Sequence, residues 1–231
     1  MGTRSETEPM WPSLPSELRD LFAPLWQEVS RLHASWELYL DLFGDEEKID
    51  VLNATVPSVF QIIEENLRES MTVSIGRLTD RAKTGNRTNL SLVRMIGLLP
   101  TYCDRDFSEE AARNMAAILA ECEPLTLHRN RRVAHNDLAT MLQYQKNPLP
   151  GIGRQRIMAV LEKIAALMNL VERRFCGNKT NYGHGIQLGT GADLLFLLEQ
   201  ALEYDRENLA TERAKLRSTK SEQTSKLRRH A

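Results

Sequence analysis

The stretch at residues 24–44, PLWQEVSRLHASWELYLDLFG, carries the pattern that decides the fold. Its apolar residues recur every three or four positions, which places their side chains on one face of an α-helix. These residues are Leu25, Val29, Leu32, Trp36, Leu40 and Phe43. Pro24 suits the first turn of such a helix, and Gly44 suits its end. The sequence therefore predicts a long amphipathic helix, preceded after Ser16 by a short helical turn.

The same periodicity recurs along the rest of the chain. Further helices are predicted from Pro57 to the segment DRAKTGN (80–86), over residues 89–99, from Ser108 toward Ala120, over residues 154–175 and over residues 192–209. Pro100 and Gly177 are the expected stops, and Ser108 before two glutamates is the expected N-cap. No segment alternates in the manner of a strand. The predicted fold class is all-α, a bundle of about five major helices with short satellite helices.

Composition limits the class of protein. The 231 residues carry a net charge of −1, so no global basic field attracts nucleic acid, and any polyanion site must be local. Three cysteines without a CxxC pair argue against a disulfide framework or a structural zinc site. The N-terminus is polar, and the apolar runs are too short to cross a membrane. We expect a soluble cytoplasmic protein with a flexible N-terminus (1–15), a helical domain (16–210) and a tail (211–231).

The tail differs from the rest of the chain in charge. Residues 211–231 contain seven Lys and Arg against two acidic residues, with few apolar side chains. Such a segment cannot bury itself, which predicts disorder. Two roles stay open for it: a solubilising tail, or a basic arm that helps to hold RNA and makes binding strongly dependent on salt.

The segment HRNRRVAHND at residues 128–137 concentrates histidine and arginine in a nearly neutral chain. Imidazole exchanges a proton near neutral pH, and guanidinium matches phosphate oxygens, so the pair suits cleavage of RNA. On an ideal helix Arg131 shares the face of His135, whereas Arg129 does not. A helix boundary within the motif would let Arg129 reach His135. The alternative is a solvated basic turn with no chemistry.

This segment resembles the R-x(4–6)-H signature of the HEPN superfamily, with Arg129, five intervening residues and His135. Four further stretches are similar, in order, to landmarks of the AbiU-like, abortive-infection branch. They are SWELYLDLFG (35–44), IDVLNATVPSVFQIIEENL (49–67), SIGRLTDRAKTGNRTNLSL (74–92) and PLPGI (148–152). The resemblance covers about residues 25–205.

The resemblance implies a metal-independent HEPN endoribonuclease, a toxin or phage-defence effector, that needs no cofactor. Arg129 and His135 match the catalytic pair, and cleavage would leave a 2′,3′-cyclic phosphate. HEPN proteins are usually homodimers in which two motifs face each other across a cleft. The implied partners are RNA, a second copy and a neutralising antitoxin. Predicted substrate contacts or supporting residues in the segment are Asn130, Arg131, Arg132 and Asn136.

Two further residues are candidates for the site. Arg77 and Asp80, three apart on a predicted helix, can form an ion pair that fixes the end of the helix. Alternatively, one of them lines the cleft near His135. His33 and Trp36, on the first long helix, are interpreted as packing residues.

Position 137 departs from a feature that is common among HEPN toxins. Where many HEPN toxins carry a tyrosine that a partner nucleotidyltransferase modifies, two residues after the histidine, this chain has Asp137. This speaks against control by tyrosine adenylylation at that position.

The rival function is a non-catalytic HEPN module that binds RNA, nucleotide or a partner protein. A purely structural helical scaffold is a third reading.

Overall fold

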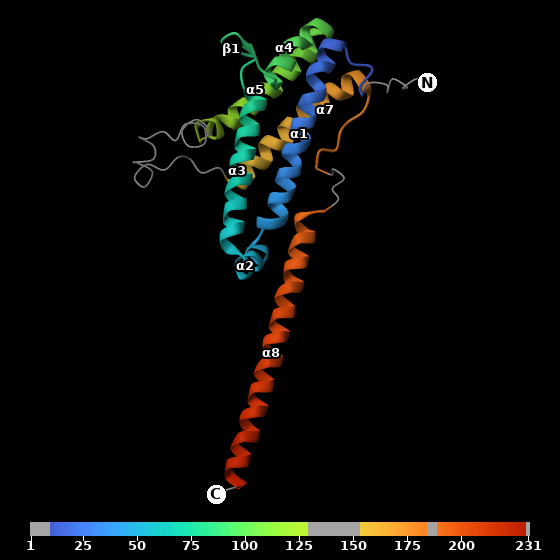
Figure 1. The fold of residues 1–231 in the computed structure, drawn as a ribbon. Coiled ribbons are helices and arrows are strands. Elements are labelled where there is room, and N and C mark those ends of the chain that lie inside the picture. Colours follow the sequence, from blue (N-terminus) through green and yellow to red (C-terminus); the bar gives the residue numbers. More distant parts are fainter. Residues whose placement is uncertain (1–9, 129–152, 184–188, 230–231) are drawn as a thin grey trace, which may run out of the picture. The chain divides into compact units, whose positions relative to one another are not determined.

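The structure, a computed structural model, describes residues 10–128, 153–183 and 189–229 (Figure 1). Within these residues it has seven α-helices and one two-stranded hairpin. The long helices are α1 (Ser16–Phe43), α3 (Pro57–Thr79), α5 (Arg105–His128), α7 (Arg154–Cys176) and α8 (Gly191–Arg229); the short ones are α2 (Glu46–Thr55) and α4 (Leu92–Tyr102). The prediction of an all-α bundle with five major helices and short satellites is confirmed. None of the helices described here is long and apolar enough to cross a membrane.

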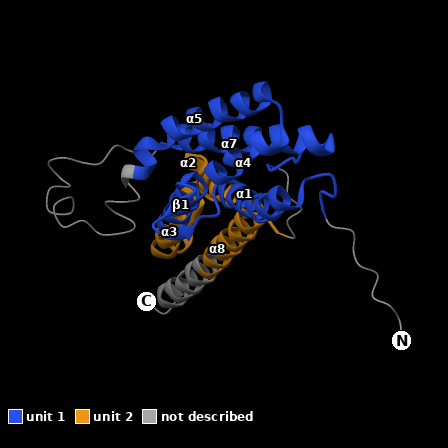
Figure 2. Cartoon of the chain, turned by 90° about the horizontal axis from the view of Figure 1, so that it is seen from above, with its two compact units in different colours: residues 1–37, 65–186 blue, residues 38–64, 187–231 orange. Residues whose placement is uncertain are grey.

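The chain divides into two compact units (Figure 2). Unit 1 comprises residues 1–37 and 65–186, and unit 2 comprises residues 38–64 and 187–231. Helices α1 and α3 each pass from one unit into the other.

Helix α1 begins at Ser16 and runs through Pro24 without a break. The prediction that Pro24 opens a separate helix is therefore wrong. A proline inside a helix removes one backbone hydrogen bond and costs about 3 kcal/mol. Leu18 and Phe22 before it, and Leu25 after it, are fully buried, and their packing holds both sides of the proline in one helix.

Helix α4 also contains a proline that was expected to end it. Ser91 is the N-cap, and its hydroxyl oxygen accepts a hydrogen bond from the Arg94 N–H at 3.3 Å. The helix therefore begins later than residue 89 and continues past Pro100 to Tyr102. Cys103 closes it by donating its N–H to the Leu99 carbonyl at 2.9 Å.

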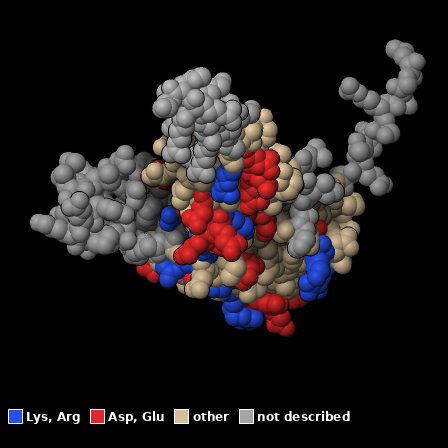
Figure 3. All heavy atoms as spheres, turned by 90° about the horizontal axis from the view of Figure 1, so that it is seen from below, with Lys and Arg blue, Asp and Glu red and all other residues tan. Residues whose placement is uncertain are grey.

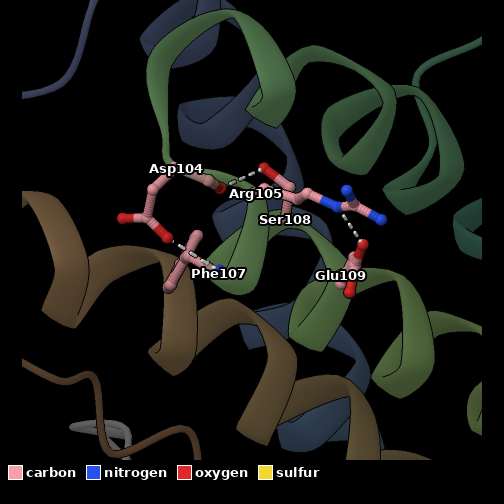
Figure 4. Close-up of polar contacts among 5 residues, drawn as sticks. All are labelled: Asp104, Arg105, Phe107, Ser108 and Glu109. Atoms are coloured by element: carbon pink, nitrogen blue, oxygen red, sulfur yellow. Dashed lines mark hydrogen bonds and ion pairs between the residues drawn. The ribbon is translucent and has the colours of Figure 1, made fainter.

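Helix α5 is capped by Asp104, and the predicted N-cap Ser108 lies one turn inside it (Figure 4). Asp104 accepts the Phe107 N–H at 2.9 Å, while the Ser108 hydroxyl donates to the Asp104 carbonyl at 2.9 Å. Arg105 and Glu109 form an ion pair at 2.6 Å across the first turn. The cap prediction failed because Asp104 satisfies a free N–H one turn earlier, which lengthens the helix.

The hairpin after α3 was not predicted. Strands β1 (Lys83–Thr84) and β2 (Arg87–Thr88) pair antiparallel across a two-residue turn, and Gly85 has a φ of +58°. A positive φ at that turn position favours glycine. Each strand has two exposed residues, so no apolar alternation could mark them in the sequence.

A buried polar network fastens the 178–183 segment onto α1 and α7 in unit 1. The carboxylate of Glu172, which is 5% exposed, accepts hydrogen bonds from Trp11 Nε1 at 2.9 Å and Thr180 Oγ1 at 2.8 Å. Thr180 Oγ1 in turn accepts from Trp26 Nε1 at 2.9 Å. Trp11 has the left-handed φ of 59°, which this network and its edge-on contacts with Phe22 and Trp26 hold in place.

Unit 2 contains α2, the adjoining ends of α1 and α3, and α8. Thr190 and Asp193 cap α8 reciprocally: the Thr190 N–H donates to Asp193 Oδ2 at 2.8 Å, and the Asp193 N–H donates to Thr190 Oγ1 at 3.1 Å. Gly191 donates its N–H to Asp41 Oδ2 at 3.1 Å, which joins α8 to the end of α1. Helix α8 extends to Arg229, so the segment predicted to be a disordered tail is helical over residues 211–229.

Candidate functional site

The Arg/His motif lies in the connection between α5 and α7. Helix α5 ends at His128, and α7 begins at Arg154 after its N-cap Gly153. The candidate residues in this connection lie outside the described residues, and their roles stay predictions. They are Arg129, Asn130, Arg131, Arg132, His135 and Asn136.

Helices α5 and α7 pack against each other and run antiparallel. Near the start of α5, Asp104 receives a hydrogen bond from Arg174 at 2.7 Å, and the same guanidinium lies 5.4 Å over the Phe107 ring. Near the other end, Glu121 pairs with Lys163. Between and beyond these contacts the facing side chains are buried: Ile118, Cys122 and Leu125 from α5, and Ile157, Val160, Leu161 and Ile164 from α7. We call residues 118–128 and 154–164, which flank the motif segment, the α5–α7 stem.

Glu121 is the centre of the charged contacts in the stem. Its carboxylate accepts a hydrogen bond from Lys163 Nζ at 2.7 Å, and Arg156 Nε lies 3.6 Å away. The hydrogen bond and the charge of Lys163, with a smaller contribution from Arg156, lower the pKa of Glu121. These ion pairs join α5 to the first turns of α7, close to where the motif segment leaves and returns. The sequence does not reveal these ion pairs, because the partners lie on different helices.

Cys122 is the stem residue whose chemistry is most altered by burial. Its side chain is 1% exposed, and desolvation raises the pKa of the thiol to about 12. A thiol with that pKa carries almost no thiolate at neutral pH. Cys122 is therefore a packing residue and not a nucleophile, although it lies close to the motif in the sequence.

Arg77 and Asp80 are the two predicted site residues that the structure describes. Helix α3 ends at Thr79, so Arg77 is in its last turn and Asp80 lies just beyond it. The Asp80 N–H donates to the Arg77 carbonyl at 3.4 Å. Arg77 is exposed and Asp80 is half-buried. Their predicted ion pair and their role in a cleft stay predictions.

His33 and Trp36 are packing residues, as predicted. Both are buried, and the His33 ring stacks on Tyr182 with 5.6 Å between ring centroids. Burial lowers the pKa of His33, so the imidazole is neutral at physiological pH.

The described surface carries acidic as well as basic groups. On the face shown in Figure 3, Asp and Glu side chains gather near the middle, with Lys and Arg side chains around them. The described part of this face therefore offers no continuous basic field for a polyanion, as the net charge of −1 leads one to expect.

A comparison with protein families identifies the chain. The family model for AbiU2, of the HEPN type, matches residues 15–187. The chain belongs to the AbiU2 family of HEPN modules. The match runs from α1 to the segment after α7, so it includes the stem and both positions of the Arg/His motif. This places the protein among the abortive-infection HEPN modules and confirms the resemblance drawn from the sequence. No match appears among curated proteins or among solved structures.

Proposed function

We propose that this AbiU2-family protein is a metal-independent endoribonuclease that acts as a toxin or phage-defence effector. The observation that carries the proposal is the pair Arg129 and His135, which has the spacing of the HEPN signature and lies within the family match. The packed α5–α7 stem supports it, because it holds together the two helix ends between which the motif lies in the sequence.

In the proposed reaction His135 takes the proton from a ribose 2′-hydroxyl, and the 2′-oxygen bonds to the adjacent phosphorus. The bond between phosphorus and the 5′-oxygen then breaks, and that oxygen takes a proton from a water molecule as it leaves. Arg129 stabilises the extra negative charge on the phosphorane oxygens. The products are a 2′,3′-cyclic phosphate and a 5′-hydroxyl. The proton removed from the 2′-hydroxyl is matched by the proton added to the 5′-oxygen, and no atom is oxidised or reduced.

A homodimer supplies what one copy lacks. Two motifs facing each other can pair Arg129 of one copy with His135 of the other, and they double the local positive charge in a chain of net charge −1. Asn130, Arg131, Arg132 and Asn136 then contact the phosphates or orient the catalytic pair. Arg77 and Asp80 are supporting candidates from the end of α3.

The proposal is tested by incubating the purified full chain with a mixture of structured RNAs in EDTA. We expect cleavage with cyclic phosphate ends, identified by mass spectrometry. His135→Ala should slow cleavage about 100-fold or more, the usual contribution of a general acid or base. His128→Ala is the matched control, because it makes the same change just outside the signature and should leave the rate within about twofold.

Two outcomes would reject this function. Cleavage that requires magnesium, or that continues undiminished in His135→Ala, would exclude the proposed mechanism. Tight RNA binding without any cleavage, together with growth that His135→Ala leaves unchanged after induced expression, would favour the non-catalytic HEPN module.

A further inference from the structure

The hairpin β1–β2, which connects α3 to α4, is exposed on both of its faces (Figure 1). All six residues over 83–88 are exposed, and a Cβ at Gly85, in the turn, would have nothing within 4 Å. A two-stranded hairpin without a packed face is marginal in water, because it buries little apolar surface. The hairpin therefore adds little to the core of unit 1, and its surface is open to a partner.

Asn89 gives the hairpin a defined conformation without an apolar core. Its side-chain amide nitrogen donates hydrogen bonds to the Arg81 carbonyl and to Thr84 Oγ1, both at 2.8 Å. Its backbone N–H donates to the Ala82 carbonyl at 2.9 Å. Through these hydrogen bonds one residue closes the base of the hairpin and holds the exposed strands in place.

The hairpin concentrates positive charge. Residues 81–88 contain Arg81, Lys83 and Arg87, and no acidic residue occurs from position 81 to position 103. All three cations are exposed, and within the ranges that the structure describes none of them forms an ion pair. Three unneutralised charges on one exposed hairpin are the kind of local basic site that a polyanion requires in a chain of net charge −1.

The register of the two strands distributes these charges over both faces of the hairpin. Lys83 is paired with Thr88, and Thr84 is paired with Arg87. Directly paired residues share a face, whereas neighbours along a strand point to opposite faces. Lys83 and Arg87 therefore lie on opposite faces. The exposed hydroxyl of Thr88, beside Lys83, can also donate a hydrogen bond to a phosphate oxygen.

We propose that the hairpin over residues 81–88 binds the phosphate backbone of single-stranded RNA. This inference rests on the proposed function, in which RNA is the substrate. Guanidinium and ammonium groups bind phosphate oxygens and release the counterions condensed on nucleic acid. A flexible strand can pass around the hairpin and meet the cations of both faces. Because phosphate contacts carry no base information, the hairpin holds RNA of any sequence.

A membrane or an apolar protein surface fits the hairpin less well. A flat anionic membrane meets only one face of a ribbon, whereas the cations lie on both. Residues 81–88 contain no aromatic or large apolar side chain that could enter lipid or fill a pocket of a protein partner. Duplex DNA shares the phosphate chemistry of RNA and is therefore a separate arm of the test.

Fluorescence anisotropy with a labelled single-stranded RNA tests the proposal, using the full chain with His135→Ala so that the RNA stays intact. Adding Lys83→Ala/Arg87→Ala should weaken binding about tenfold at low salt. The plot of log affinity against log salt concentration should also become shallower by about 1.4, since each phosphate contact with a single strand contributes about 0.7. The loss should be the same for RNAs of different sequence.

Arg113→Ala/Lys179→Ala is the matched control for these charges. It also removes one arginine and one lysine, at exposed positions outside the hairpin. Because salt screens charges that lie away from the bound strand, it should change the affinity less than about threefold.

A second pair of variants tests the conformation of the hairpin. Asn89→Ala keeps every positive charge but removes both side-chain hydrogen bonds at the base. It should weaken RNA binding about threefold or more and leave the salt dependence unchanged, because the same cations must then be ordered on binding. Asn86→Ala removes the same amide from the exposed turn and leaves those hydrogen bonds in place. Equal affinities of these two variants would contradict the role given to Asn89.

The remaining outcomes would overturn the proposal. Absence of RNA binding, binding that is undiminished in Lys83→Ala/Arg87→Ala, or an equal loss in the Arg113→Ala/Lys179→Ala control would each do so. Loss of binding to duplex DNA alone in the hairpin variant would assign the hairpin to DNA. Cleavage is measured separately with His135 intact. Cleavage without a contribution of the hairpin to binding would leave only the nuclease proposal standing, and hairpin-dependent binding without cleavage would leave only this one.

Discussion

Thr180 joins the segment after α7 to two helices. Its hydroxyl bridges Trp26 Nε1 and the Glu172 carboxylate at 2.9 and 2.8 Å. Its backbone N–H donates to Asn169 Oδ1 at 2.8 Å, and its carbonyl accepts from Asn169 Nδ2 at 3.0 Å. Through one residue, the segment after α7 is therefore bound to α1 and α7.

Replacing Thr180 by valine should destabilise unit 1 by about 1–3 kcal/mol. Valine keeps the shape but leaves the Trp26 N–H without its acceptor and removes one hydrogen bond to the buried carboxylate of Glu172. Urea unfolding followed by tryptophan fluorescence measures the change, because Trp11, Trp26 and Trp36 all lie in unit 1.

Thr211→Val is the control for that substitution. Thr211 is exposed on α8, and its hydroxyl donates to the backbone carbonyl of Glu207, one turn earlier, at 2.9 Å. Its replacement should change stability by less than about 0.5 kcal/mol. Equal effects of the two valines would show that the Thr180 network contributes no stability.

The roles of some residues can be recognised from the sequence, and the roles of others cannot. Arg129 and His135 could be recognised because their spacing is a local pattern. Glu172 and Thr180 could not, since a glutamate in an amphipathic helix normally faces solvent and only its tertiary contacts with Trp11 and Thr180 explain its burial. Glu121 was missed for the same reason.

At the scale of elements, periodicity predicted the helices and local signals misplaced several of their ends. Pro24 and Pro100 were taken as boundaries, yet both lie inside helices: buried apolar residues flank Pro24 on either side, and Leu99 is buried directly before Pro100. Ser108 was taken as a cap, although Asp104 supplies one a turn earlier. Burial depends on partners distant in sequence, so it can override a proline or a cap signal that acts over one turn.

The ion pairs of Glu121 predict how the stability of the α5–α7 stem depends on pH. The pKa of Glu121 is lowered in the folded protein, chiefly by the hydrogen bond from Lys163. A lowered pKa means that the contribution to stability is complete above the ordinary glutamate value of 4.5 and is lost as pH falls through the folded value. Glu121→Gln should therefore lower Tm at pH 7, and the difference from wild type should shrink as the pH approaches 3.

Glu123→Gln is the control for the stem. Glu123 lies two residues further along α5 and is exposed. Thermal unfolding of wild type and the two variants at several pH values between 7 and 3 distinguishes the effects of the two substitutions on Tm. A gap between Glu121→Gln and wild type that stays constant over this range would show that the ion pairs with Lys163 and Arg156 are not its cause.

The close packing around Gly191, at the start of α8, leads to a second prediction about an element. A Cβ at position 191 would lie 2.5 Å from Asp41 Cβ and 3.2 Å from both Leu38 Cδ1 and Leu42 Cγ. Gly191→Ala should therefore weaken the docking of α8 on α1 by about 1–3 kcal/mol, even though alanine favours helix. Faster hydrogen exchange at residues 192–202 would report this loss.

Gly189→Ala provides the comparison, because nothing lies within 4 Å of a Cβ at that position. It should leave the exchange rates of α8 close to those of wild type. If both alanines change exchange equally, the effect comes from the loop backbone and not from contact with α1.

At the scale of the whole molecule, the sequence predicted the fold class and the family, but it did not predict the extent of α8. Residues 211–229 have too few apolar side chains to form a core, which led to the expectation of disorder. The structure nevertheless continues α8 as a helix to Arg229. A helix that has already begun extends by adding one backbone hydrogen bond per residue, which an apolar pattern does not report.

Assembly also determines how the proposed nuclease site is built. If Arg129 of one copy acts with His135 of the other, neither Arg129→Ala nor His135→Ala homodimers have a complete site. A mixed dimer of the two variants keeps one Arg129 and one His135 in the correct trans arrangement. We therefore expect the two inactive proteins, when mixed and allowed to exchange subunits, to recover up to about a quarter of wild-type cleavage, since half of the dimers are mixed and each has one of two sites.

The complementation measurement uses equal concentrations of total protein and the same RNA in EDTA. Each variant alone, at the full concentration, is the control for residual activity. Activity that stays at the level of the separate variants, although subunit exchange is shown by mass spectrometry of the mixed dimer, would place both residues of a working site in one chain. This result would therefore test how the proposed nuclease site is divided between the two subunits.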